Sequence, residues 1–328
     1  MAPTPRVSEL NPKAVLLTNP YCTPLREMFD QLLTSSATSW NQIEADFLTA
    51  MSEFDSGLPL AFDGDDENKQ TQSKELSAAI QNGKGDWFNN VLAYLLEQCS
   101  GIETLYVRRK VPGLIIPEHN LDGVFPGDED REIEFLLEAK MMGTPKHANS
   151  PGEKPAGRAG SADTNKRVKE LAFKSIDLKG EAARRLTMVG QSPTSGGAGG
   201  GDLSTWLHGS RPRIYFFLAA RVLSDTDFAA VVRWAETAAQ VVDAVGLYCY
   251  EPSEGSHTTY RRRDGVPTAY ALERVLYRAC TELQGLRTAP PPPIPTEVGP
   301  SPAALAEQLA EDASGTDSKL ESWLCDEH

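Results

Sequence analysis

Two carboxylic acids and an amine, Asp122, Glu138 and Lys140, lie within the short segment NLDGVFPGDEDREIEFLLEAK. Carboxylate oxygens are hard ligands suited to Mg²⁺, which binds through one or two carboxylates and keeps several of its waters. The backbone carbonyl of Ala139 would supply a further oxygen ligand. An amine beside such an ion can orient or deprotonate an attacking water and offset negative charge in the transition state. These residue types therefore predict metal-assisted hydrolysis.

The sequence pattern around these residues predicts how they are held. Apolar and charged residues largely alternate from Glu132 to Lys140. A period of two predicts a half-buried strand, on which Glu138 and Lys140 share one face. Asp122 lies on a second apolar run, 121–125, and the Pro-Gly-Asp-Glu-Asp between the runs is typical of a turn. We expect a hairpin that brings Asp122 beside Glu138 and Lys140.

Periodicity elsewhere predicts an α/β core, in which a mixed central sheet is flanked by helices. A helix is expected from about Asp86, its candidate cap, to Cys99, with Gly101 ending it. Helices are also expected at 24–33 and 38–54, and a polar surface loop at 63–74. The later elements are expected as strands at 102–111, 121–125, 132–142, 213–223 and 244–250 and as helices at 164–189, 225–243 and 270–283.

The 328 residues divide by composition into three parts. Residues 1–85 are expected to form an N-terminal arm and a helical region. Residues 86–287 are expected to form the core, with loops that contact the substrate. Residues 288–328 are rich in proline and acidic residues, which predicts a disordered tail.

The charge is distributed unevenly. The net charge of -14 argues against nucleic acid as a partner, yet the segment from Lys140 to Arg185 holds eleven Lys and Arg against five Asp and Glu. A basic segment directly after an acidic strand is the electrostatic layout of an enzyme acting on phosphodiesters. The alternative is that these side chains only solubilise the surface. The candidate DNA contacts are Lys146, His147, Lys154, Arg158, Lys166, Arg167 and Lys169.

A second basic cluster comprises Arg261, Arg262 and Arg263. It fits a further phosphate contact and a solvated hairpin tip equally well. The glycine run at 195–201 lacks the Gly-Lys-Ser/Thr ending of a phosphate-binding loop, so no nucleoside triphosphate is expected. Five scattered cysteines without a CxxC pair favour reduced thiols over a zinc site. No apolar run is long enough to cross a bilayer and no signal peptide is visible, so we expect a cytoplasmic protein.

Asp122, fifteen intervening residues and Glu138-Ala139-Lys140 at the end of an apolar strand resemble the PD-(D/E)xK nuclease superfamily, the fold of many type II restriction endonucleases. The resemblance covers roughly residues 86–250, with the order helix, three strands, helix, strand. It implies that Asp122 and Glu138 bind the metal and that Lys140 is the catalytic lysine. Some members add a glutamate from the preceding helix, for which Glu97 is the candidate. The sequence departs from the motif at Leu121, where the motif has proline.

The resemblance implies a restriction-endonuclease-like fold and a Mg²⁺-dependent endonuclease that cuts double-stranded DNA, as a type II restriction enzyme acting as a homodimer. Alternatives are a repair or modification-dependent nuclease of the same fold, or a non-catalytic DNA-binding or scaffold protein. Glu138 and Lys140 would then be charge pairs on a solvated strand face. A rival acid and lysine, Asp177 and Lys179, fall within a helical pattern, where they are expected to be surface charges.

Overall fold

The computed structural model describes residues 22–57, 67–102, 105, 109–126, 131–145, 159–162, 164–188, 203–256 and 258–288, with the backbone alone for 67–82. Four candidate DNA contacts, Lys146, His147, Lys154 and Arg158, lie outside the described residues. So does nearly all of the expected tail.

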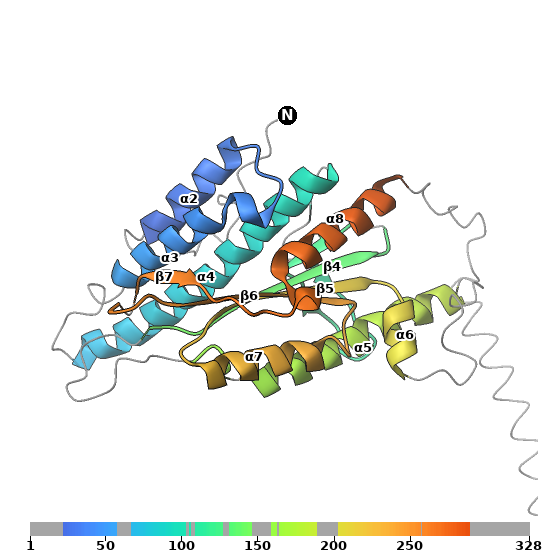
Figure 1. Cartoon of the computed structure of the whole chain (residues 1–328). Helices are drawn as coiled ribbons and strands as arrows, with labels where there is room; N and C mark the ends of the chain where they lie inside the picture. The colour runs from blue at the N-terminus through green and yellow to red at the C-terminus, as the bar shows by residue number, and fades with distance from the viewer. Residues whose placement is uncertain are drawn as a thin grey trace, which may run out of the picture.

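A five-stranded mixed sheet forms the centre of the molecule (Figure 1). Its strand order is β3-β4-β5-β6-β7, in which β4, β5 and β6 are parallel and the edge strands β3 and β7 are antiparallel to their neighbours. Strands β1 and β2 form a small antiparallel pair. The strands are β1 (Lys110–Val111), β2 (His119–Asn120), β3 (Gly123–Phe125), β4 (Phe135–Met142), β5 (Arg213–Arg221), β6 (Ala244–Pro252) and β7 (Tyr260–Arg262).

Helices cover both faces of the sheet. Helices α2, α3, α4 and α8 lie on one face, and α5 and α7 lie on the other (Figure 1). Two short 3₁₀ helices, η3 (Trp40–Gln42) and η5 (Thr268–Tyr270), precede α3 and α8. The α-helices are α2 (Thr23–Thr34), α3 (Glu44–Gly57), α4 (Glu67–Ser100), α5 (Thr164–Met188), α6 (Leu203–Gly209), α7 (Asp225–Ala238) and α8 (Leu272–Thr288).

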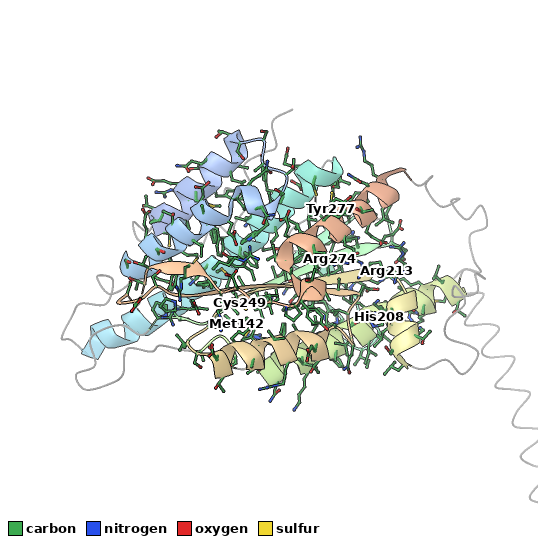
Figure 2. All side chains as sticks on the ribbon, viewed as in Figure 1. Met142, His208, Arg213, Cys249, Arg274 and Tyr277 are labelled. Atoms are coloured by element: carbon green, nitrogen blue, oxygen red, sulfur yellow. The ribbon has the colours of Figure 1, made fainter. Side chains whose placement is uncertain are left out.

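Strand β4 is buried on both faces, because it lies between two hydrophobic cores. Phe135, Leu137 and Ala139 belong to the core beneath α2, α3, α4 and α8, which we call the first core. Leu136 belongs to the second core, beneath α5 and α7. Side chains fill the space on both sides of the sheet (Figure 2). The prediction of a half-buried strand was wrong in this respect, and Glu138 is consequently only 6% exposed.

The mixed α/β sheet flanked by helices confirms the predicted fold class at this level. Helix α4 begins at Glu67, so the expected loop at 63–74 is partly helical and Asp86 lies inside the helix rather than capping it. Gly101 ends α4 as predicted, with a φ of 69° that favours glycine. Strand β4 begins at Phe135 rather than 132, and α6 and β7 were not predicted. None of the described helices has the length and apolar character needed to span a membrane.

The N-terminal helices share the first core with the sheet. Helix α4 also runs without interruption through residue 85, where the expected core begins. Polar contacts also join the N-terminal helices to the sheet. Tyr260 of β7 donates its backbone N–H to the Ser52 hydroxyl at 3.0 Å and its own hydroxyl to Asp55 at 2.6 Å. Asp55 is in turn paired with the buried Lys84.

Candidate active site

Asp122, Glu138 and Lys140 lie together in the structure. The Nζ of Lys140 is 3.0 Å from Oδ2 of Asp122 and 2.9 Å from Oε1 of Glu138. The same Oδ2 accepts the backbone N–H of Ala139 at 3.0 Å. The three residues singled out by type and spacing are therefore in direct contact.

A second lysine, Lys174 of α5, completes what we call the carboxylate–lysine cluster: Asp122, Glu138, Lys140 and Lys174. Its Nζ lies 2.8 Å from Oε2 of Glu138. From the sequence, Lys174 was only one of the eleven basic residues between Lys140 and Arg185, with no predicted role. A signal was present, since Leu171, Lys174 and Leu178 share one helical face at three- and four-residue spacing. Leu171 and Leu178 both pack in the second core, so that face points toward the sheet.

Strand register and one helix fix Asp122. In the antiparallel β3–β4 pair, Gly123 is opposite Leu137, so Asp122 comes next to Glu138. On the first-core side, the buried Asn89 of α4 donates its side-chain amide to the backbone carbonyl of Asp122 at 2.6 Å. The carboxylates are thus held by a strand, a helix and the short connection before β3.

The cluster has strongly coupled charges. Burial raises the pKa of Asp122, and the neighbouring carboxylate of Glu138 raises it further. Burial alone would also raise the pKa of Glu138, but the ammonium groups of Lys140 and Lys174 outweigh it and lower that pKa. Burial would lower the pKa of Lys140, but the two carboxylates more than compensate and raise it. The raised pKa keeps Lys140 protonated at neutral pH.

The donor set of the cluster fits a magnesium ion. One carboxylate oxygen of Asp122 and one of Glu138 lie within 3.0 Å of the Lys140 nitrogen. Both are hard oxygen donors of the kind that Mg²⁺ takes, and Lys140 would neighbour an ion bound to them. The Ala139 N–H points toward Asp122, and on a regular strand the carbonyl of the same residue is expected at the same edge.

The protein would supply few ligands to such an ion. Within the described part of the chain, no group of three or more His, Cys, Asp or Glu side chains could hold a metal. Asp122, Glu138 and the Ala139 carbonyl would therefore have to be completed by water and substrate phosphate. That mixture is the one that Mg²⁺ commonly takes.

Glu97 does not join the cluster. Its carboxylate accepts the backbone N–H of Leu105 at 2.5 Å, and the side chain is buried. Glu97 is eight positions beyond Asn89 on α4, which places it about 12 Å further along the helix axis. Here the glutamate stabilises the chain where it leaves α4, and the structure gives no support to a role for Glu97 in metal binding.

The described candidate DNA contacts on α5 lie one to two turns before Lys174. Lys166 and Arg167 both pair with Glu170, at 3.7 and 2.7 Å. Lys169 is exposed and has no ion-pair partner among the residues that the structure describes. The start of α5 therefore carries basic side chains about 7 to 12 Å along the helix axis from Lys174.

Arg261, Arg262 and Arg263 lie on or directly after β7, at the opposite edge of the sheet from β3. Each forms an ion pair: Arg261 with Glu251 at 2.8 Å, Arg262 with Glu44 at 3.5 Å and Arg263 with Asp225 at 2.6 Å. These acids neutralise much of the positive charge. The arrangement favours the alternative of a solvated, ion-paired surface over a DNA contact.

Asp177 and Lys179 are both buried, so the prediction that they are surface charges was wrong; Lys179 pairs with the buried Asp243 at 2.7 Å. The Asp177 carboxylate accepts the backbone N–H groups of Ile115 and Ile116, at 2.7 and 3.1 Å. It also contacts Nε2 of the buried His119 at 2.7 Å. The predicted helix is present, but the helical pattern of the sequence could not predict that the loop with Ile115 and Ile116 packs against this side of α5.

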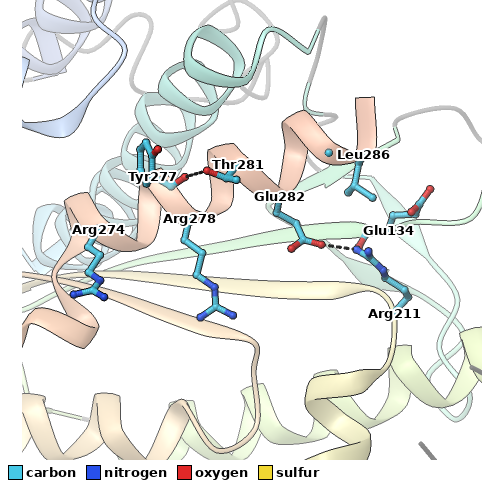
Figure 3. A pocket seen from close by; sticks show the side chains of 9 residues that line it. Glu134, Arg211, Arg274, Tyr277, Arg278, Thr281, Glu282 and Leu286 are labelled. Atoms are coloured by element: carbon cyan, nitrogen blue, oxygen red, sulfur yellow. Dashed lines mark hydrogen bonds and ion pairs between the residues drawn. The ribbon is translucent and has the colours of Figure 1, made fainter. Parts of the chain in front are cut away.

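A groove of about 770 Å³ runs along α8 on the first-core side of the sheet (Figure 3). Arg274, Tyr277 and Arg278 line it from the helix, and Arg211 pairs with Glu282 of the same helix at 2.8 Å. No residue of the carboxylate–lysine cluster lines this groove. Glu138 faces α5 on the other side of the sheet, so the groove and the cluster are separate features.

Comparison of the chain with protein-family models, with curated proteins and with solved structures gave no match.

Proposed function

We propose that the protein is a Mg²⁺-dependent endonuclease with a restriction-endonuclease-like core of the PD-(D/E)xK superfamily, which hydrolyses phosphodiester bonds of double-stranded DNA. The observation that carries the proposal is the convergence of Asp122 and Glu138 on the nitrogen of Lys140. The motif spacing predicted this grouping, and the sheet register provides a physical reason for it.

The side chains divide the work by charge. Asp122 and Glu138, with the Ala139 carbonyl, would hold the magnesium ion, which supplies Lewis acidity and a reactive water when bound. Lys140 is placed to orient that water and to offset negative charge on the phosphate in the transition state. Strand β4 is buried on both faces, so it positions these groups with little freedom.

The basic start of α5 supports DNA as the substrate, because Lys166 and Lys169 lie on the helix that carries Lys174. Their side chains would contact phosphates, which position a duplex without reading its sequence. Sequence-specific cleavage by a cytoplasmic homodimer, as in type II restriction enzymes, belongs to the same proposal. Two active sites related by a twofold axis would cut both strands of a palindrome.

Plasmid cleavage tests the proposal. Purified protein with Mg²⁺ or Mn²⁺ should convert supercoiled plasmid to linear fragments, and discrete bands would indicate a sequence-specific enzyme. Asp122→Asn, Glu138→Gln and Lys140→Met should each reduce the rate about a thousandfold or more. Glu132→Gln is the matched control, since Glu132 is an exposed acid that precedes the same strand. If a folded wild-type protein binds DNA but cuts it with neither metal, the proposal is wrong.

One observation favours a second candidate, a non-catalytic DNA-binding or scaffold protein. The two carboxylates of the cluster are balanced by two ammonium groups, as in a structural ion-pair network. In that case Lys140→Met would leave buried acids without a partner and destabilise the fold. Thermal unfolding discriminates the candidates. A nuclease variant should lose cleavage by more than its change in stability explains, whereas a scaffold has no cleavage to lose.

A further inference from the structure

Both oxygens of the Glu138 carboxylate contact ammonium groups from different elements. Lys140 of β4 takes Oε1 at 2.9 Å, and Lys174 of α5 takes Oε2 at 2.8 Å. Lys140 also contacts Asp122, whereas among the described residues Lys174 forms an ion pair only with Glu138. A substitution of Lys174 therefore changes the surroundings of Glu138 and leaves the contact between Lys140 and Asp122 in place.

The pair is largely withdrawn from water. The side chain of Glu138 is 8% exposed and that of Lys174 is 19% exposed. Charges in such surroundings interact more strongly than exposed ion pairs, because less solvent screens them. The ammonium of Lys174 thus provides a substantial part of the positive charge that Glu138 requires when no metal is bound.

A divalent cation held by Asp122 and Glu138 would compete with that ammonium. The ion and Lys174 would be cations sharing one small carboxylate, and like charges at such distances repel. When DNA binds, its phosphate would bring a new negative group close to Lys174. Phosphate is a hydrogen-bond acceptor that lysine commonly contacts.

We propose that Lys174 competes with the metal ion for Glu138 and passes to a substrate phosphate once the ion is bound. The proposal rests on the proposed function, since it assumes that Asp122 and Glu138 hold a metal. With this role for Lys174, helix α5 contributes to the site in addition to the motif residues at β3 and β4. In the metal-free protein Lys174 holds the Glu138 carboxylate in place.

The first test is metal binding in the absence of DNA. Isothermal titration with Mn²⁺ would compare the wild-type chain with Lys174→Met, which removes the charge, and Lys174→Arg, which keeps it. Lys174→Met should bind Mn²⁺ about tenfold more tightly, while Lys174→Arg should stay close to wild type. Lys169→Met is the matched control, because it removes an exposed charge from the same helix, and it should change the affinity less than twofold.

The second test is DNA binding in the presence of the metal, with Lys140→Met in every protein to suppress cleavage while both metal-binding carboxylates are kept. Removing Lys174 should reduce the dependence of log K on log salt concentration by about one unit, as expected for one lost phosphate contact. An unchanged slope would overturn the transfer to phosphate. Lys174→Gln serves if Lys174→Met fails to fold, since glutamine is neutral but can still donate a hydrogen bond to Glu138.

The outcomes separate this proposal from the proposed function. If wild type and Lys174→Met bind Mn²⁺ equally, competition by Lys174 is wrong and the nuclease proposal is unaffected. If neither wild type nor any variant binds Mn²⁺ while circular dichroism shows folded protein, the proposed function itself fails. Weaker Mn²⁺ binding by Lys174→Met would also overturn the competition, because it would make Lys174 an aid to metal binding.

Discussion

Nζ of Lys140 lies 3.0 Å from Oδ2 of Asp122, although the two residues are 18 positions apart in the sequence. This contact joins the residue just before β3 to the C-terminal half of β4. It places one positive charge between two acids, so the charge state of each residue depends on the other two.

Acidification should weaken metal binding at a higher pH than for an ordinary carboxylate site. Burial and the charge of Glu138 raise the pKa of Asp122, and a protonated carboxyl group is a poor metal ligand. Mn²⁺ affinity should therefore fall as the pH decreases toward this raised pKa. Titrations with Mn²⁺ at pH values from about 4 to 8, in steps of about one unit, would measure how the affinity depends on pH. In Glu138→Gln the remaining affinity should persist to lower pH, because the repelling charge is gone.

Asn89→Ala should loosen the site from the opposite side of the sheet. The Asn89 amide donates to the Asp122 carbonyl at 2.6 Å, and its loss leaves that carbonyl without this donor. We expect a loss of about 1–3 kcal/mol in the free energy of unfolding and weaker Mn²⁺ binding.

Asn90→Ala is the matched control for Asn89. Asn90 is buried one position further along α4, and its side chain bonds within the helix to the carbonyl of Asp86 at 2.7 Å. It should lose comparable stability and keep the affinity for Mn²⁺. Equal metal affinity in both variants would mean that Asn89 does not position Asp122.

Asp177→Asn should destabilise the protein at neutral pH. Burial alone would raise the pKa of Asp177, but hydrogen bonds from His119, Ile115 and Ile116 outweigh it and lower the pKa. The carboxylate therefore stabilises the fold above its unfolded pKa of about 3.9, and this stabilisation is lost as the pH falls through the lower folded pKa. Urea unfolding at pH 7 should show a loss of about 2–4 kcal/mol.

The pH dependence gives an internal check on this prediction. Because asparagine does not titrate, the difference between wild type and Asp177→Asn should shrink as the pH falls below about 4. Asp264→Asn, at an exposed side chain, should change stability by less than about 0.5 kcal/mol. A constant difference from pH 7 to pH 3 would show that the charge of Asp177 is not the stabilising feature.

Neutralising Lys166 and Lys169 should weaken DNA binding and reduce its salt dependence. Each lost phosphate contact lowers the slope of log K against log salt concentration by about 0.9 for a duplex. Fluorescence anisotropy over a salt series would measure it, and Lys146 and Arg158 belong to the same prediction. Arg261→Gln is the control, since that arginine is paired with Glu251. An equal effect in the control would assign the loss to overall charge.

The candidate site was predictable where it depends on short-range pattern. The alternation along β4 and the turn before it are local features of the sequence. They were sufficient to predict that Asp122 lies beside Glu138 and Lys140. Lys174 and Asp177 depend instead on the rotation of α5 about its axis against the sheet and a loop, which tertiary packing decides. Glu97 illustrates the same limit, since a helix can have the right position in the chain and present the wrong residue to the site.

The first core joins the beginning of the described chain to its end. Asn41, just before α3, bonds to Glu273 of α8 across 232 positions, and α3 and β7 are linked across similar separations. Contacts so distant in sequence form only after a large loss of chain entropy, which slows folding. During synthesis on the ribosome, α2 and α3 would therefore await their partners until β5, β6 and α8 have emerged. Their apolar faces make this interval the one in which chaperones would matter most.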